Sequence, residues 1–200
     1  MGALPILLRL SDVPVLVVGL GSVGRRRAMR LVEAGARVLA VDPAEVQAPE
    51  GVEHRREPYR AADLEGRRLV LATATPEVNR AVVADARAWG VWVNSASAPE
   101  DSDFHLPATW TDGPVTLAVA TSGIPALART LRDRAAAALG PEAATLATIL
   151  SALRPVLRAR VADRARRAAV LRAWADPRWL DHVRTHGVEA TAAALRQTIG

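Results

Sequence analysis

The sequence contains no cysteine, and this absence excludes disulfide bridges, thiolate metal ligands and cysteine nucleophiles together. Aromatic residues make up only 4% of the chain, but hydrophobic residues make up 50%, which is sufficient for a packed core. No uninterrupted apolar run reaches the roughly 18 residues of a membrane helix, and the first ten residues lack the features of a signal peptide. We therefore expect a globular, cytoplasmic protein with no membrane partner and no metal site.

Lysine is absent as well, so all 26 Lys+Arg residues are arginine, and the formal net charge is +5. Guanidinium groups form paired hydrogen bonds with carboxylates and phosphates, which suits a ligand that carries many carboxylates as well as it suits nucleic acid. A solvated arginine-rich surface is the simpler alternative. The arginines of the expected helix 154–172 surround it, are interrupted by Asp163 and have no aromatic platform beside them. This pattern favours a solvated face over a nucleic-acid interface.

The first hundred residues alternate between two patterns. Continuous apolar runs typical of buried strands occupy 13–18, 37–41, 68–72 and 91–93, and helical spacing of apolar residues occupies 25–35 and 77–89. Strands that alternate with helices predict an α/β fold with a mainly parallel sheet. After an acidic loop, a strand at 115–119 and a helix at 125–139 follow. Gly140–Pro141 should break that helix, and the helical remainder should be interrupted near Pro155, Asp176–Pro177 and Gly187.

A glycine loop of the form G-x-G-x-x-G lies between the first strand and the first helix. This placement is typical of a Rossmann-type dinucleotide site, in which the glycines allow a tight turn and close approach of the pyrophosphate. A structural glycine-rich turn is the alternative. The residues expected to surround the pyrophosphate are Gly19, Gly21, Ser22, Val23 and Gly24.

The second strand ends at Asp42, where a carboxylate can accept hydrogen bonds from ribose hydroxyls and would repel a 2′-phosphate. This predicts NAD as the cofactor in preference to NADP, with Pro43 and Ala44 completing that side of the site. The alternative is that Asp42 only caps or turns the chain before Pro43.

Small residues follow the third long strand at Thr73, Ala74 and Thr75, where they would let the cofactor pass. Asn79, four residues further on, either orients this loop or is an ordinary surface residue of the following helix. Asn94 ends the next strand, and we expect it to face the nicotinamide.

The order and spacing of these motifs resemble the N-terminal module of siroheme synthases, over approximately residues 3–135. That module is the precorrin-2 dehydrogenase, and it is often also a sirohydrochlorin ferrochelatase. Besides the glycine loop and its continuation to Leu31, the matching residues are Leu4-Pro5-Ile6, Glu33-Ala34-Gly35-Ala36, Ala72-Thr73-Ala74 with Asn79, and Asn94 followed by Pro99, Phe104 and Pro107.

The resemblance implies an anionic tetrapyrrole substrate that loses a hydride to NAD and a proton, yielding sirohydrochlorin. It also implies a homodimer built by residues 115–139. The small-residue loop of the family matches Thr121-Ser122-Gly123, just before a helix whose N-terminus could receive a substrate carboxylate. Ser122 and Arg129 are therefore the candidate substrate-binding residues. A helix-capping hydroxyl and an exposed helix arginine are the alternatives.

The chain departs from the family at position 97, where Ser97 occupies the place of an aspartate that usually follows the asparagine by three residues. A serine can orient a group, but it is a poor base without a partner. The candidate catalytic residues are Ser97, as an orienting group, and His105, with Asp103 as another proton acceptor. Loss of the aspartate predicts weak or absent ferrochelatase activity. The loop around Ser122 is also one residue shorter than in the family.

These observations predict a Rossmann-type parallel sheet, a small dimerisation segment and a helical C-terminal region. The expected boundaries are an NAD-binding Rossmann domain at 1–111, the dimerisation segment at 112–140 and a helical domain at 141–200. The alternative function is a non-catalytic NAD-sensing dimeric module that signals through its helical tail.

Overall fold

The computed structural model describes residues 3–199 and divides into two compact units, one ending at Leu106 and the other beginning at Pro107. The division precedes the expected boundary at residue 111. The reason is that strand β6 (Ala108–Asp112) pairs with β7 (Val115–Val119) and so belongs to the second unit.

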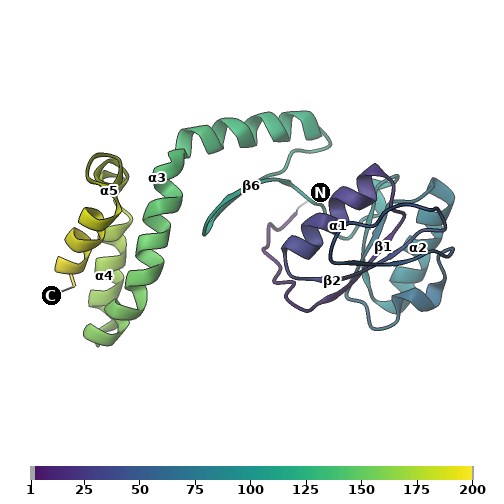
Figure 1. Ribbon diagram of the computed structural model, residues 1–200, viewed down its shortest axis with the longest axis horizontal. Helices are drawn as coiled ribbons and strands as arrows, with labels where there is room; N and C mark the ends of the chain where they lie inside the picture. Colours follow the sequence, from purple (N-terminus) through teal and green to yellow (C-terminus); the bar gives the residue numbers. More distant parts are fainter. Residues whose placement is uncertain (1–2, 200) are drawn as a thin grey trace. The chain divides into compact units, whose positions relative to one another are not determined.

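The N-terminal unit is built on a five-stranded parallel sheet in the order β3-β2-β1-β4-β5. Figure 1 labels β1 and β2 of this sheet and the helices α1 and α2 of the same unit. The chain runs outward from β1 to β3 on one side, then returns to place β4 and β5 on the other. The point where this order reverses lies between β1 and β4, and ligands of such sheets bind outside the carboxyl ends of the strands there. The strands are β1 (Pro14–Val18), β2 (Arg37–Val41), β3 (Val52–Arg55), β4 (Leu69–Ala72) and β5 (Trp92–Ser95).

The sheet is covered on both faces, which explains why its strands are continuous apolar runs. Successive side chains of a strand point to opposite faces. Leu16 and Val18 of β1 accordingly share a core with α2 (Pro76–Trp89), whereas Val15 and Val17 share another with α1 (Ser22–Glu33). The predicted α/β fold with a parallel sheet is confirmed.

Strand β3 is absent from the expectations drawn from sequence because Val52-Glu53-His54-Arg55 has no apolar run. It lies at the edge of the sheet, where its backbone pairs with β2 although its side chains are only partly buried. Two short 3₁₀ helices, η1 (Ala61–Leu64) and η2 (Pro99–Asp101), complete the unit.

The C-terminal unit consists of the β6–β7 hairpin and three helices, which are α3 (Pro125–Arg160), α4 (Arg164–Trp174) and α5 (Arg178–Gln197). The predicted breaks at Gly140–Pro141 and Gly187 are confirmed as kinks, because Gly140 and Gly187 have φ of 68° and 78°. The break between α4 and α5 at Asp176–Pro177 is confirmed as well.

The interruption expected near Pro155 is wrong, since α3 continues through it. Pro155 and Ser151, whose carbonyl loses its intrahelical partner, are both exposed, so water can satisfy that carbonyl. The helix instead ends at Arg160. The arginines of 154–172 therefore lie on two helices, not on one.

The core of the C-terminal unit lies where α3, α4 and α5 meet. Leu153 and Leu157 of α3 pack with Trp174 and Leu195, and the Trp174 indole donates a hydrogen bond of 2.8 Å to Thr198 Oγ1. By length and composition α3 could also cross a membrane, contrary to the expectation that no segment would qualify. In this structure its second half provides the helix that α5 packs against.

Candidate functional site

The residues expected to bind the cofactor lie at or just after the carboxyl ends of parallel strands. The glycine loop follows β1, Asp42 follows β2, the Thr73–Thr75 loop follows β4, and Asn94 is the third residue of β5. Carboxyl ends of neighbouring parallel strands share one edge of the sheet, so the fold brings these loops to the same edge of the N-terminal unit.

The three glycines of the loop meet three different steric demands. Gly19 has φ of 93°, and a Cβ there would lie 2.7 Å from Ala74 N. A Cβ on Gly24 would lie 1.9 Å from Gly19 O, so only glycine lets α1 start this close to β1. At Gly21, by contrast, no atom lies within 4 Å of a Cβ position.

The open space at Gly21 is where a phosphate can approach the backbone. Gly21 is the N-cap of α1 and contributes no side-chain cap, so the N–H groups of the first turn are available to an anion. The predicted positions of Gly19, Gly21 and Gly24 thus fit a bound pyrophosphate.

Asp42 joins the end of β2 to the glycine loop. Its Oδ2 accepts a hydrogen bond of 2.6 Å from Leu20 N, and its Oδ1 accepts one of 2.8 Å from Ala44 N. The second contact is the turn foreseen as the alternative role of Asp42. Because a carboxylate oxygen can accept more than one hydrogen bond, the same group retains capacity for ribose hydroxyls.

Strand β3 adds residues beside Asp42 that reasoning from sequence missed. His54 Nε2 lies 3.1 Å from Asp42 O, and Asp42 N donates to Arg55 O at 3.2 Å. Arg56 follows and forms an exposed ion pair of 3.3 Å with Glu45. The pairing of β3 with β2 brings Arg56 to this end of the site, and no sequence motif signals it.

The loop after β4 is held against the glycine loop by Thr73. Its backbone N donates to Val18 O at 2.8 Å, and its hydroxyl lies 2.9 Å from Val18 O and 2.8 Å from Gly19 O. Since both acceptors are carbonyls of the β1 end, the Thr73 side chain serves to position the loop.

Asn79 is the buried centre of the contacts between the β4 and β5 loops. Its side chain, on a residue that is 1% exposed, accepts from Ala74 N at 2.9 Å and donates to Ala74 O at 3.2 Å and to Ser97 Oγ at 3.0 Å. The role of Asn79 in orienting the loop is confirmed, and the alternative of a surface residue is wrong.

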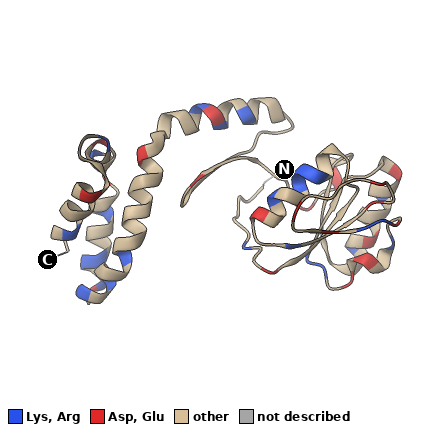
Figure 2. Cartoon of the chain, in the orientation of Figure 1, with Lys and Arg blue, Asp and Glu red and all other residues tan. Residues whose placement is uncertain are grey.

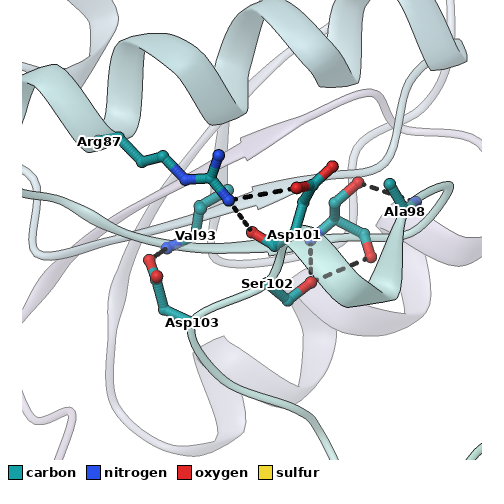
Figure 3. Close-up of polar contacts among 7 residues, drawn as sticks. Arg87, Val93, Ala98, Asp101, Ser102 and Asp103 are labelled. Carbon is teal, nitrogen blue, oxygen red and sulfur yellow. Dashed lines mark hydrogen bonds and ion pairs between the residues drawn. The ribbon is translucent and has the colours of Figure 1, made fainter.

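The loop after β5 is fastened to the sheet by side chains that Figure 3 shows. Arg87 of α2 forms an ion pair of 3.2 Å with Asp101, and Ser102 Oγ accepts a hydrogen bond of 2.9 Å from Ser95 N. Asp103 Oδ2 accepts one of 2.8 Å from Val93 N. Asp103 is thus engaged with the edge strand, which makes it less available as a proton acceptor.

The expected catalytic and nicotinamide residues differ in exposure. Ser97 and His105 are exposed, whereas Asn94 is 4% exposed and donates from Nδ2 to Phe104 O at 2.7 Å. Asn94 Oδ1 is buried and makes no hydrogen bond within residues 3–199. The Asn94 amide is thus buried and engaged with Phe104, and its contact with nicotinamide stays a prediction.

The arginines of α1 are the nearest basic residues in sequence to the glycine loop (Figure 2). Arg25 donates to Gln47 O. Burial, with the neighbouring Arg26 as the lesser cause, lowers the pKa of Arg27, and its Nη1 is buried without a hydrogen bond to any described residue.

Ser122 and Arg129 belong to the C-terminal unit, and both are exposed. Ser122 does not cap α3, because the N-cap is Ile124 and the neighbouring hydroxyl of Thr121 donates to Ile124 O at 2.7 Å. The capping alternative for Ser122 is therefore wrong. Arg129 lies in the second turn of α3.

The glycine loop, the open helix N-terminus and the acidic residue after β2 together define a dinucleotide-binding Rossmann domain. The chain belongs to the family described as "Putative NAD(P)-binding", which matches residues 6–108. The matched residues include every strand of the parallel sheet and the loops that follow these strands at its carboxyl edge.

The chain is similar to several siroheme synthases. The chain is 39% identical to the siroheme synthase of Methylococcus capsulatus over 84% of its own length, and 32% identical to siroheme synthase 1 of Aeromonas salmonicida over all of it. It spans only 37% and 44% of those relatives. The fold matches SirC, a precorrin-2 dehydrogenase of known structure, with a TM-score of 0.74, 21% identity and 98% coverage of both chains.

The two glycines with opposite surroundings provide a test of the pyrophosphate site. We expect Gly21→Ala to change the free energy of unfolding by no more than about 0.5 kcal/mol, because the new methyl group meets nothing. It should nevertheless weaken NAD binding, measured by calorimetry, by at least about tenfold, because the methyl group occupies the space for phosphate.

Gly24→Ala is the matched variant and should destabilise the fold by about 1–3 kcal/mol through the clash with Gly19 O. Wild-type NAD affinity in Gly21→Ala would contradict the assignment of the open space to pyrophosphate.

Proposed function

We propose that this chain is an NAD-dependent precorrin-2 dehydrogenase, which oxidises precorrin-2 to sirohydrochlorin in siroheme biosynthesis. The observation that carries the proposal is the similarity to siroheme synthases along the whole chain, not only along the Rossmann unit. The similarity of fold to SirC over 98% of both chains supports it. The phosphate-accessible loop at Gly21 supplies the cofactor site that this reaction needs.

In the proposed reaction, precorrin-2 transfers a hydride to NAD and releases a proton, and the products are sirohydrochlorin and NADH. Bound NAD supplies the hydride acceptor. The chain contributes position: the glycine loop and the first turn of α1 hold the pyrophosphate, and Asp42 holds a ribose. Ser122 and Arg129 of the C-terminal unit are the proposed ligands for substrate carboxylates.

In this proposal Ser97 is not the base that accepts the proton released by precorrin-2. The Ser97 hydroxyl oxygen already accepts a hydrogen bond from Asn79, and within residues 3–199 no histidine or carboxylate hydrogen-bonds to it. Among the expected residues, exposed His105 is the proposed acceptor, with bulk water as the final one.

The serine at position 97 should lower the rate of metal insertion more than the rate of dehydrogenation. Hydride transfer depends on positioning by the Rossmann unit, whereas insertion of a divalent cation into sirohydrochlorin needs a group that removes pyrrole protons or coordinates the metal. We therefore propose that ferrochelatase activity is weak or absent.

Incubation of the protein with precorrin-2 and NAD should produce sirohydrochlorin and NADH, both followed by absorbance. Addition of Fe²⁺ should then give little siroheme from the wild-type protein. Ser97→Asp should raise the rate of metal insertion by about 100-fold or more, the usual contribution of a positioned acid or base. Asn79 can accommodate this change, because its amide would donate to the new carboxylate.

Binding of NAD without any oxidation of precorrin-2 would favour the alternative, a non-catalytic NAD-sensing module. Rapid iron insertion by the wild-type protein, unchanged by Ser97→Asp, would show that the metal-inserting group lies elsewhere.

NAD should bind more tightly than NADP, because the Asp42 carboxylate can accept from the ribose hydroxyls and would repel a 2′-phosphate. Hydrogen bonds to charged groups predict a preference of about 10- to 100-fold in calorimetric titrations. Asp42→Ala should abolish the preference. Equal affinities of the wild-type protein for NAD and NADP would instead indicate that Arg56 binds the 2′-phosphate. Its present ion pair with Glu45 is exposed and therefore weak, so it can be exchanged for the phosphate.

The proposed assembly is a homodimer formed by the hairpin and the first half of α3. Ile124, Leu127 and Leu131 have exposed fractions of 54%, 43% and 42%, and their spacing of three and four residues puts them on one side of the chain at the start of α3. A cluster of exposed large apolar side chains of this kind is typical of an interface.

Light scattering at micromolar concentration should give the mass of a dimer for the wild-type protein. The double variant Leu127→Glu with Leu131→Glu should give a monomer that still binds NAD. Leu171→Glu, at a comparably exposed leucine of α4, should remain dimeric. A monomeric wild-type protein would refute the proposed assembly.

A further inference from the structure

The buried amide of Asn79 determines how the Ser97 hydroxyl can be used. The orientation of the amide follows from Ala74 N, which can only donate, so the Asn79 atom at 2.9 Å from it must be the oxygen. The other atom is then the amide nitrogen, and it donates one hydrogen to Ala74 O and the other to Ser97 Oγ. All the hydrogens of this amide are therefore assigned.

Because Ser97 Oγ accepts from Asn79, its own hydrogen is not needed for that contact. Ser97 is exposed, so its O–H can donate to a ligand at the sheet edge. This is the reverse of the function that an aspartate would have at position 97, since a carboxylate only accepts. The contact with Asn79 occupies one lone pair of Ser97 Oγ and leaves its O–H as a donor, which an aspartate at this position would lack.

The order of the strands indicates which part of a dinucleotide Ser97 would meet. The pyrophosphate belongs at the β1 loop, and Asp42 places the adenosine ribose after β2, on the β3 side of β1. The other half of the dinucleotide must extend in the opposite direction, across the ends of β4 and β5. Ser97 lies two residues after β5, on a loop fastened by Arg87–Asp101 and Ser102–Ser95 (Figure 3).

We propose that the Ser97 hydroxyl, positioned by Asn79, donates a hydrogen bond to the carboxamide oxygen of the nicotinamide ring. In this assignment Ser97 binds the cofactor and selects its nicotinamide end, and Asn79 is a positioning residue that acts through Ser97. The inference rests on the NAD part of the proposed function and is independent of precorrin-2. It also gives Ser97 a function in a chain whose family usually has aspartate there.

The experiment compares NAD with ADP-ribose, which has the same adenosine, pyrophosphate and second ribose but no nicotinamide. Calorimetric titration of the full-length protein gives both affinities without any turnover. The ratio of the two affinities isolates the nicotinamide contact, because general damage to the fold or to the pyrophosphate loop weakens both ligands together.

Ser97→Ala should reduce the preference for NAD over ADP-ribose by about 2- to 12-fold, the usual value of one neutral hydrogen bond, and should leave ADP-ribose affinity unchanged. Asn79→Asp should give the same reduction. It keeps the acceptor for Ala74 N but presents a second carboxylate oxygen to Ser97, which would then donate its hydrogen to that oxygen and no longer to the ligand.

The double variant Ser97→Ala with Asn79→Asp should have the same ratio as Ser97→Ala alone, because both changes remove one donor. Tyr59→Phe is the matched control, since it removes another side-chain contact to α2, the 3.0 Å hydrogen bond from Tyr59 to Asp85, and should leave the ratio unchanged.

An unchanged ratio in Ser97→Ala, or an equal loss of NAD and ADP-ribose affinity, would overturn the proposal, even if Asn79→Asp fails to fold. A reduced ratio in Ser97→Ala with a wild-type ratio in a folded Asn79→Asp would overturn the positioning role of Asn79. Absence of precorrin-2 oxidation by the wild-type protein would refute the proposed reaction and leave this binding test intact.

Discussion

The close approach of Gly24 to the Gly19 carbonyl is the constraint on which the site depends. A Cβ at position 24 would lie 1.9 Å from that oxygen, so any side chain there would push α1 away from the end of β1. With glycine, the helix starts directly at the edge of the sheet, at the end of β1, beside the point where the strand order reverses. The position of the N-terminus of α1, and with it the position of the helix dipole, follows from this contact.

The other loops are positioned relative to the glycine loop by a chain of polar contacts. Asp42 ties the end of β2 to Leu20, and Thr73 ties the end of β4 to Gly19. Asn79 extends the connection from Ala74 to Ser97 after β5. These hydrogen bonds are partly buried, and hydrogen bonds shielded from water are costly to break, so the edge of the sheet is preorganised for a dinucleotide. Such preorganisation is what a hydride-transfer enzyme contributes beyond the chemistry of its cofactor.

The two units have different relationships to the sequence. In the Rossmann unit three sequence signals predict the same fold, because each reflects a strong local constraint. These signals are the periodicity of apolar residues, the glycine motif and the acidic residue after β2. In the C-terminal unit the pattern is weaker, since Ala, Leu and Arg form helices in almost any arrangement. In the C-terminal unit, glycine predicted helix kinks better than Pro155 did. Gly140 and Gly187 kink their helices, whereas Pro155, on an exposed face, does not.

The sequence by itself determined the alternation of strands and helices, the loop that accommodates phosphate and the family to which the chain belongs. These depend on residue type and on spacing along the chain. Tertiary structure alone decided that the buried Asn79 side chain hydrogen-bonds to Ser97 in the loop after β5. It also decided that β3 brings Arg56 near Asp42, and that the Asn94 amide donates to Phe104 O. The physical reason is that a hydrogen bond between side chains far apart in the chain depends on which strands are neighbours. Asp42 and Leu20, 22 residues apart, meet only because β1 and β2 pair in register.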